Sequence, residues 1–252
     1  MLSLDGNRSY AVPKSTTGGS LQTNLTWNTY NAPLTATGPN SDTTSFSYDA
    51  YARPNQRTEA NGAITTLTYT TSPDVMTQAT TGARWTRTYL DGFGRTMRVV
   101  SGYTNGGTDT VVSTVDTKYA PCACSPIGKL WKTSMPYGPG GAVRWVEHEY
   151  DAIGRTVKVT QPEATLGAGS AGMTTYSYVA NTVTVTDPAG KWKKSVSDVL
   201  GNLVSVIEPN PAGGADYVTD YTYSVFGKLL TASMTRPGYG GGSAVTQTRT
   251  WV

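Results

Sequence analysis

Histidine and cysteine are nearly absent from this chain, and charged side chains are sparse. Its 252 residues include one His and two Cys, and only 15% are Asp, Glu, Lys or Arg. A zinc site needs three or four ligands, and a Ser–His–acid triad would depend entirely on His148. We therefore expect no catalytic residues, no metal and no cofactor, and we predict that the chain is not an enzyme.

Long apolar runs and dense basic clusters are missing too. No stretch approaches the roughly 18 consecutive apolar residues of a membrane helix, and the N-terminal MLSLDGNRSY lacks the regions of a signal peptide. The net charge is only +3, and Trp192 interrupts the longest basic cluster, which is Lys191, Lys193 and Lys194. We expect neither a nucleic-acid partner nor a membrane span.

Threonine, tyrosine and glycine are abundant instead. Thr accounts for about one residue in six, and the chain has 16 Tyr and 28 Gly. Branched and aromatic side chains pack well on a pleated sheet, and residues 181–186, NTVTVT, alternate as strand residues do. The composition predicts an ordered, all-β protein.

A short motif recurs along the chain: an acid or polar residue, two variable residues and a glycine. Asp, Asn or Ser at the first position of a type I turn can accept a backbone N–H, and glycine at the fourth can adopt positive φ. Each copy therefore predicts a turn between two strands, with the acid in a structural role. The strong copies are Asp91–Gly94, Asp151–Gly154, Asp187–Gly190 and Asp198–Gly201. Ser125–Gly128 and Ser224–Gly227 carry a hydroxyl instead, and Asn28–Asn31 and Asp49–Ala52 end without glycine.

Residues on either side of the turn complete the motif. Tyr150 precedes its turn and Arg155 follows it, so we expect the guanidinium to lie on or beside that ring within one hairpin. One hairpin cannot bury its own face, and we expect copies to stack. The other strand ends are predicted to turn at Asn61-Gly62, Thr81-Gly82, Gly106-Gly107, Gly213-Gly214 and the insertion 162–169.

Taken together, these copies of YDxxGR resemble the RHS or YD-repeat family over roughly Trp27 to Val252, with Tyr150–Arg155 as the full match. The resemblance implies stacked antiparallel β-hairpins that form a curved or spiralling sheet, part of a β-shell. We divide the chain into an atypical N-terminal edge or cap, 1–25, and a repeat array, 26–252, which we expect to continue beyond its end. The structural repeat positions are Tyr48, Asp49, Tyr89, Asp91, Gly94, Arg95, Tyr150, Asp151, Gly154, Arg155, Asp187, Gly190, Asp198, Gly201, Tyr223 and Gly227.

The resemblance also implies a function. In this family, the B–C components of Tc toxins and bacterial Rhs effectors enclose a C-terminal toxin, and teneurins use a similar shell for adhesion. The chain has no convincing copy of the family's core segment, so we predict a non-catalytic wall segment that surrounds a toxin or other polypeptide. Its expected partners are the rest of its own RHS protein and the enclosed C-terminal cargo. Its expected location is secreted or at the cell surface, bacterial in type, with the export signal outside this chain.

The alternative function is an extracellular adhesion or carbohydrate-binding module. Exposed aromatic rings could stack on sugars, although packing between hairpins explains the same residues. The candidates are Trp85, Trp131, Trp145, Trp192 and the tyrosines. Open strand edges would also favour edge-to-edge self-association.

The remaining candidates for chemistry are few. Cys122 and Cys124 would share one strand face, and we interpret them as packed or free thiols, with a disulfide or a metal site as alternatives. Glu147 and Glu149 flank His148, and their spacing alone would suit a pair of glycosidase carboxylates. We expect these acids to form a solvated rim.

Overall fold

The computed structural model describes residues 2–4, 6, 12–19, 21–162, 172–211, 213–236, 238 and 242–251. These residues form 21 β-strands and no α-helix. They include no helix with the length and apolar character of a membrane span. The prediction of an all-β fold built from stacked antiparallel hairpins is confirmed.

The chain divides into two compact units: Met1–Thr117 with Pro136–Gly141, and Lys118–Met135 with Ala142–Val252. The strands of unit 1 are β1 (Leu2–Leu4), β2 (Pro13–Gly18), β3 (Leu21–Trp27), β4 (Pro33–Thr37), β5 (Thr43–Tyr48), β6 (Pro54–Thr58), β7 (Ile64–Thr70), β8 (Met76–Thr81), β9 (Arg84–Leu90), β10 (Thr96–Asn105) and most of β11 (Thr108–Cys122). Those of unit 2, after the end of β11, are β12 (Ser125–Ser134), β13 (Trp145–Tyr150), β14 (Thr156–Thr160), β15 (Met173–Val179), β16 (Thr182–Thr186), β17 (Trp192–Ser197), β18 (Leu203–Glu208), β19 (Tyr217–Tyr223), β20 (Leu229–Arg236) and β21 (Val245–Thr250).

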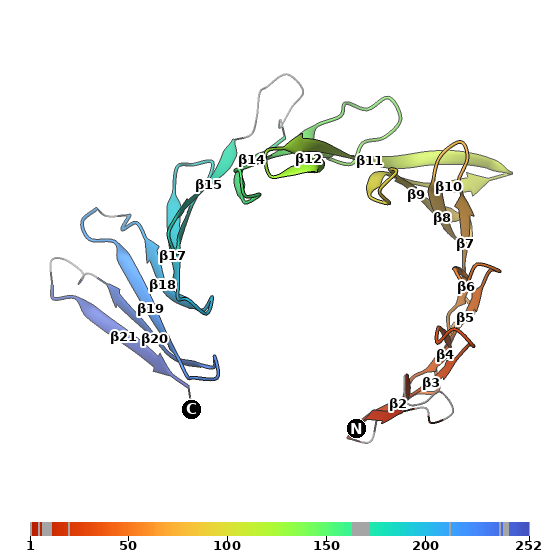
Figure 1. Cartoon of the computed structure of the whole chain (residues 1–252), viewed down its shortest axis with the longest axis horizontal. Helices are drawn as coiled ribbons and strands as arrows, with labels where there is room; N and C mark the ends of the chain where they lie inside the picture. Colours follow the sequence, from red (N-terminus) through yellow and green to blue (C-terminus); the bar gives the residue numbers. More distant parts are fainter. Residues whose placement is uncertain are drawn as a thin grey trace. The chain divides into compact units, whose positions relative to one another are not determined.

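Within each unit the strands form a meander, in which each strand pairs with its neighbours in the chain (Figure 1). Consecutive turns therefore lie at opposite edges of the sheet. We call one edge of each unit the YD edge: it holds the turns after β3, β5, β7 and β9 in unit 1, and those after β11, β13, β15, β17 and β19 in unit 2. The opposite edge is the far edge.

Little of either unit is fully buried. Among the described residues, the buried apolar side chains are Val12, Trp85 and Val100. Apart from these few, most strand residues keep partial exposure, and extensive packing joins only strands that follow one another in the chain. Such a sheet is stabilised mainly through interfaces between neighbouring strands.

Paired threonines explain part of the unusual composition. The hydroxyls of Thr26 and Thr35 lie 2.6 Å apart across β3 and β4, and those of Thr37 and Thr43 lie 2.9 Å apart across β4 and β5. Threonine offers a branched Cβ for the pleat and a hydroxyl for its cross-strand partner. A sheet with two exposed faces can therefore use it where a buried sheet would use valine.

One predicted turn is wrong. Ser125–Gly128 lies within β12, and the turn between β11 and β12 is at Ala123 and Cys124. Gly128 keeps a positive φ of 86°, and a Cβ there would lie 2.9 Å from the carbonyl oxygen of Ala120. The glycine accommodates the neighbouring strand at a close approach and does not end the hairpin.

The other copies of the motif are turns, including those without glycine. Asn31 and Ala52 occupy the position of the glycine with φ of 59° and 60°. The predicted turn at Gly106 and Gly107 connects β10 and β11. Of the insertion 162–169, residues 163–169 lie outside the described part of the chain.

Candidate functional site

The aspartate of each strong repeat on the YD edge closes its own turn. In the turn after β13, Asp151 Oδ1 accepts the N–H of Ile153 at 3.1 Å and that of Arg155 at 2.8 Å. Asp151 Oδ2 accepts Arg155 Nε at 2.7 Å, and Gly154 completes the turn with φ of 88°. The same bonds join Asp49 to Arg53 and Asp91 to Arg95.

These interactions lower the pKa of the aspartates. For Asp151, partial desolvation raises the pKa, but hydrogen bonds from the Arg155 side chain and backbone, with its positive charge, outweigh it. The pKa values of Asp49 and Asp91 are lowered through the same balance. Each carboxylate is held ionised by the turn that it closes, which is a structural use of charge.

The base of the motif reaches the next hairpin. Arg155 Cζ lies 4.3 Å from the ring centroid of Tyr178, in β15. The equivalent distance from Arg53 to Tyr69 is also 4.3 Å, and Lys129 Nζ lies 4.4 Å from the Tyr150 ring. The prediction that Arg155 covers Tyr150 of its own hairpin is wrong, because the strand after the turn lies beside the following hairpin.

The tyrosine under each base also donates a hydrogen bond from its hydroxyl group. The acceptor is the carbonyl oxygen of the residue that follows that base in the chain. The Tyr178 hydroxyl donates to the carbonyl oxygen of Thr156, the residue after Arg155, at 2.8 Å. Tyr150 donates in the same way to Leu130, the residue after Lys129, at 2.7 Å. Further bonds of this kind join Tyr48 to Pro33, Tyr69 to Pro54 and Tyr223 to Leu203. Burial raises the pKa of Tyr48 and Tyr150.

The motif is therefore a connection between consecutive hairpins, which we call the inter-hairpin clasp. It consists of an acid that fixes a turn, a base that stacks on the next tyrosine, and that tyrosine's hydroxyl bond back to the strand. The spacing within the turn was visible in the sequence. The partner of the base was missed, although the chain order of the strands could have indicated it.

Some repeat positions lack part of the clasp. Among the described residues we find no such hydroxyl bond for Tyr89, which pairs across the strands with Met76 and Arg98. Asp187 closes a turn with Gly190, as predicted, but this turn joins β16 to β17 at the far edge. Asp198 bonds Asn202, which has no positive charge, at 2.9 Å. In the turn before β20, Ser224 Oγ accepts two N–H groups at 3.3 Å and 3.2 Å.

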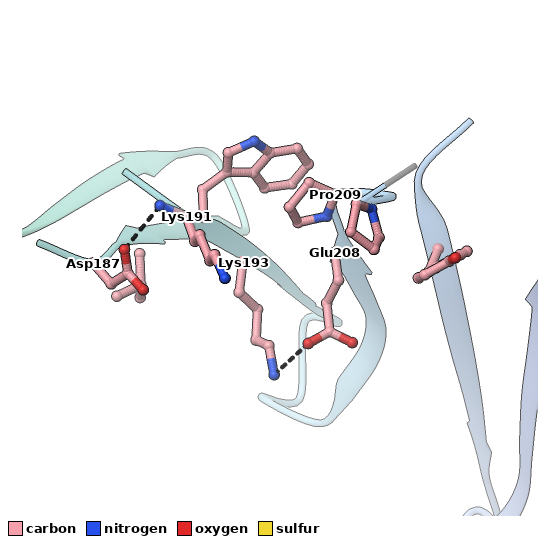
Figure 2. Close-up of a pocket in the computed structure, with 9 residues that line it drawn as sticks. Asp187, Lys191, Lys193, Glu208 and Pro209 are labelled. Atoms are coloured by element: carbon pink, nitrogen blue, oxygen red, sulfur yellow. Dashed lines mark hydrogen bonds and ion pairs between the residues drawn. The ribbon is translucent and has the colours of Figure 1, made fainter. Parts of the chain in front are cut away.

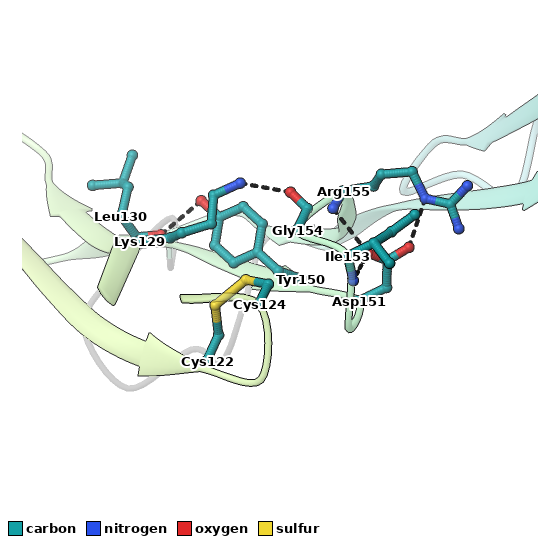
Figure 3. The surroundings of a disulfide bond; sticks show 9 residues. All are labelled: Cys122, Cys124, Lys129, Leu130, Tyr150, Asp151, Ile153, Gly154 and Arg155. Atoms are coloured by element: carbon teal, nitrogen blue, oxygen red, sulfur yellow. Dashed lines mark hydrogen bonds and ion pairs between the residues drawn. A yellow bond between two sulfur atoms is a disulfide. The ribbon is translucent and has the colours of Figure 1, made fainter. Parts of the chain in front are cut away.

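The two cysteines form a disulfide, so the interpretation as free thiols is wrong. Cys122 and Cys124 are joined around the turn at the end of β11, with their Cα atoms 5.1 Å apart. Figure 3 shows the bond beside Lys129 and Gly154, where Lys129 Nζ donates to the Gly154 carbonyl at 2.5 Å. This hairpin has no aspartate in its turn, and the disulfide fixes it covalently.

The acidic residues around His148 make ion pairs with lysines. Glu147 lies 3.1 Å from Lys132 Nζ, and Glu149 lies 2.5 Å from Lys158 Nζ. In the described part of the chain, no group of three or more His, Cys, Asp or Glu is arranged to hold a metal ion. Both contacts are cross-strand pairs, and Lys132 is half-buried, with only 15% of its side chain exposed.

A groove of about 730 Å³ lies at the far edge of unit 2 (Figure 2). Its apolar lining comes from Val185, Trp192, Pro209, Pro211 and Tyr217. Its polar lining comes from Asp187, Lys191, Lys193 and Glu208. Lys193 and Glu208 form a pair at 2.7 Å, and Asp187 Oδ1 accepts the N–H of Lys191 at 2.8 Å. The groove offers an apolar surface with charged groups at its rim.

The tryptophans proposed for sugar stacking differ in their surroundings. Trp85 is only 2% exposed, and a Cβ on Gly102 would lie 2.5 Å from its ring. Lysines lie over the rings of the others: Lys132 over Trp131 at 4.0 Å, Lys118 over Trp145 at 5.2 Å and Lys194 over Trp192 at 4.4 Å. Because Trp85 is buried, a sugar could not stack on its ring. A lysine ammonium lies over each of the other three rings.

Comparison with known proteins supports the fold. No protein-family model and no curated protein match the chain. The chain is similar to the crystal structure of TcdB2–TccC3, with a TM-score of 0.53 and 15% identity, over 89% of this chain and 16% of that chain. Crystal structures of TcdB2–TccC3–Cdc42 and of TcdB2–TccC3 without its hypervariable C-terminal region give TM-scores of 0.40 and 0.39 at 12% and 13% identity. They cover 95% and 100% of this chain, and 18% and 17% of theirs. The first likeness shows that this chain shares a β-sheet fold with a part of TcdB2–TccC3.

Proposed function

We propose that this chain is a non-catalytic wall segment of an RHS-type shell that surrounds a toxin or another polypeptide. The observation that carries the proposal is the inter-hairpin clasp, which repeats along the sheet and uses its acids, bases and tyrosines for connection. The Arg155–Tyr178 and Arg53–Tyr69 stacks are typical copies. A fold shared with TcdB2–TccC3 also supports it.

The proposed partners are the remainder of the same RHS protein and a cargo at its C-terminal side. The proposed location is secreted or at the cell surface of a bacterium, and the disulfide between Cys122 and Cys124 supports an oxidising compartment. The cross-strand ion pairs of Glu147 and Glu149 with lysines support a structural use of these two acids.

Protease protection tests the proposal in the natural protein that carries this segment. An enclosed polypeptide resists trypsin while the wall is intact. We expect the double variant Tyr150→Phe with Tyr178→Phe to expose the enclosed polypeptide to trypsin at a lower temperature. The reason is that both tyrosine hydroxyl bonds between hairpins are lost. Digestion of the cargo at the same rate in both proteins, at every temperature, contradicts enclosure by this wall.

The groove at the far edge of unit 2 favours carbohydrate binding as a second candidate function. Trp192 and Tyr217 supply aromatic surface there, beside the carboxylates of Asp187 and Glu208. Titration with cell-surface polysaccharides tests it: saturable binding that Trp192→Ala abolishes supports this candidate. Binding that is absent, or unchanged in Trp192→Ala, excludes a site in this groove.

A further inference from the structure

The turns at the YD edge of unit 2 expose large apolar side chains. These residues, which we call the apolar tip row, are Ile153 (74% exposed), Val179 (69%), Val199 (102%), Leu200 (82%), Val225 (92%) and Phe226 (87%). Five of them lie in the turns after β13, β17 and β19, and Val179 is the last residue of β15, directly before the turn at Ala180 and Asn181, so four neighbouring hairpins contribute at this edge. Scattered exposed apolar residues are ordinary, whereas a contiguous row of them marks an interaction surface.

The geometry of the turn does not require apolar tips. At the far edge of unit 2, the turn closed by Asp187 has the same hydrogen bonds from backbone N–H groups as the turn closed by Asp151, yet its tip is Pro188 and Ala189. The tip of the Asp151 turn includes Ile153. The same backbone thus carries small residues at one edge and large apolar ones at the other.

Unit 1, considered by itself, has the same asymmetry. Its YD edge exposes Tyr30 and Tyr51 at 74% and 79%, and Phe93 is exposed in the turn after β9. The tips at its far edge are small or polar: Pro39-Asn40, Ala60-Asn61, Gly82-Ala83 and Gly106-Gly107. Three of the four YD-edge turns of unit 1 thus carry an exposed aromatic tip, and the exception is the turn after β7, at Ser72, Pro73 and Asp74.

The tip row is large enough for a stable contact. Turns on one edge are two strand spacings apart, about 10 Å, so the four hairpins that carry the row span about 30 Å. Full burial of a Val, Leu, Ile or Phe side chain corresponds to roughly 60–120 Å² of apolar surface. The side chains of the row, with the turn backbone between them, approach the roughly 800 Å² that each partner contributes to a standard interface.

The charges beside the row balance. Asp151 is paired with Arg155 at 2.7 Å. Asp198 keeps its negative charge, because its partner Asn202 is uncharged, and Lys228 in the turn after β19 carries a positive charge. A partner therefore meets an apolar surface without excess charge of one sign. An identical row has the same spacing and the same lack of net charge, and a two-fold axis places like patches against each other.

We propose that the apolar tip row of unit 2 is an interface at which a second copy of this chain docks through the same row. Side chains from one copy would lie in the gaps of about 10 Å between the tips of the other. The proposal concerns the ends of the turns and is independent of any enclosed polypeptide. It also differs from pairing of open strand edges, which would use backbone hydrogen bonds.

Sedimentation velocity of the 252-residue chain tests the proposal at about 1–200 µM, a range suited to a standard-size interface. We expect a dimer, and we expect Leu200→Ser with Phe226→Ser to weaken it by at least about 100-fold, because each change removes two buried side chains per dimer. Both residues are 80% exposed or more in one copy, so the thermal stability of the monomer should not change.

Val245→Ser is the matched control. Val245 is 57% exposed at the start of β21, at the far edge of the same unit, so its loss removes apolar surface away from the row. It should leave the dissociation constant unchanged. A chain that stays monomeric throughout the range overturns the proposal. A dimer that survives the double change, or that Val245→Ser weakens equally, overturns it as well and places the contact elsewhere.

Discussion

Arg155 lies over the ring of Tyr178, one hairpin further along the chain, while its Nε binds Asp151 of its own turn. The guanidinium thus contacts two consecutive hairpins at once. The Tyr178 hydroxyl in turn donates to the carbonyl oxygen of Thr156, so a stacking contact and a hydrogen bond both connect the two hairpins. In a sheet with few buried side chains, such repeated contacts between neighbours decide whether the array is cooperative.

Removal of a clasp hydroxyl should destabilise the sheet. We expect Tyr178→Phe to lower the free energy of unfolding by about 1 kcal/mol, because the Thr156 carbonyl loses its partner while the ring stays in place. Chemical denaturation measures the change. Tyr51→Phe is the control: Tyr51 is 79% exposed at a turn tip, and its loss of a hydroxyl should have no effect.

Arginine and lysine should not be equivalent in the clasp. Arg155→Lys keeps the charge but loses the planar group that binds Asp151 Oδ2 and stacks on Tyr178 at 4.3 Å. We expect a loss of about 0.5–1 kcal/mol, seen as a lower melting temperature. In a Tyr178→Leu background the stacking contribution is already gone, so the same substitution should cost less. Equal losses in both backgrounds would show that stacking contributes nothing.

The fourth position of the turn should discriminate between glycine and alanine. Gly154 has φ of 88°, and a Cβ there would lie 3.4 Å from Lys129 Nζ and 3.5 Å from Cys124 Cβ. Gly201 has φ of 86° and open space around it. We expect Gly201→Ala to cost about 1–2 kcal/mol from backbone strain alone, and Gly154→Ala to cost more. Conversely, Ala52→Gly relieves φ of 60° and should stabilise by a few tenths of a kcal/mol. An unchanged melting temperature in Gly154→Ala would contradict the role assigned to this glycine.

Stability should decrease at acidic pH. The pKa values of Asp49, Asp91, Asp151 and Asp198 are lowered in the folded chain from the ordinary value of 3.8. Their contribution is complete above the pKa of the unfolded chain and is lost as pH falls through the lower folded pKa, because the unfolded state then binds more protons. Thermal unfolding between about pH 5 and pH 2.5 measures this decline. Asp151→Asn should make it shallower, and an identical slope in that variant would exclude the carboxylate as a source.

The disulfide should contribute modestly. Cross-linking residues two positions apart closes a very short loop, for which chain entropy predicts about 1.5 kcal/mol. The double variant Cys122→Ser with Cys124→Ser should therefore unfold at a lower denaturant concentration than the oxidised chain. Reduced wild-type protein should match the variant. A larger difference between those two would point to a role for the thiols other than cross-linking.

The sequence by itself determined the turns and the strands between them. The bonds of Asp151 to Ile153 and Arg155 join residues no more than four positions apart, so the five residues from Asp151 to Arg155 encode them locally. The alternation in residues 182–186 likewise needs no distant partner to favour a strand. Such local preferences are visible in any single copy of the repeat.

Only the tertiary structure decided which neighbouring hairpin each side chain contacts. Arg155 and Tyr178 meet because β14 pairs with β15, although the residues between them include a long connection. Cys122 and Cys124 formed a bond, and Ser125–Gly128 continued a strand, because the neighbouring strand β11 sets the conformation of β12. Contacts between hairpins depend on register and loop length, and local sequence encodes neither of these.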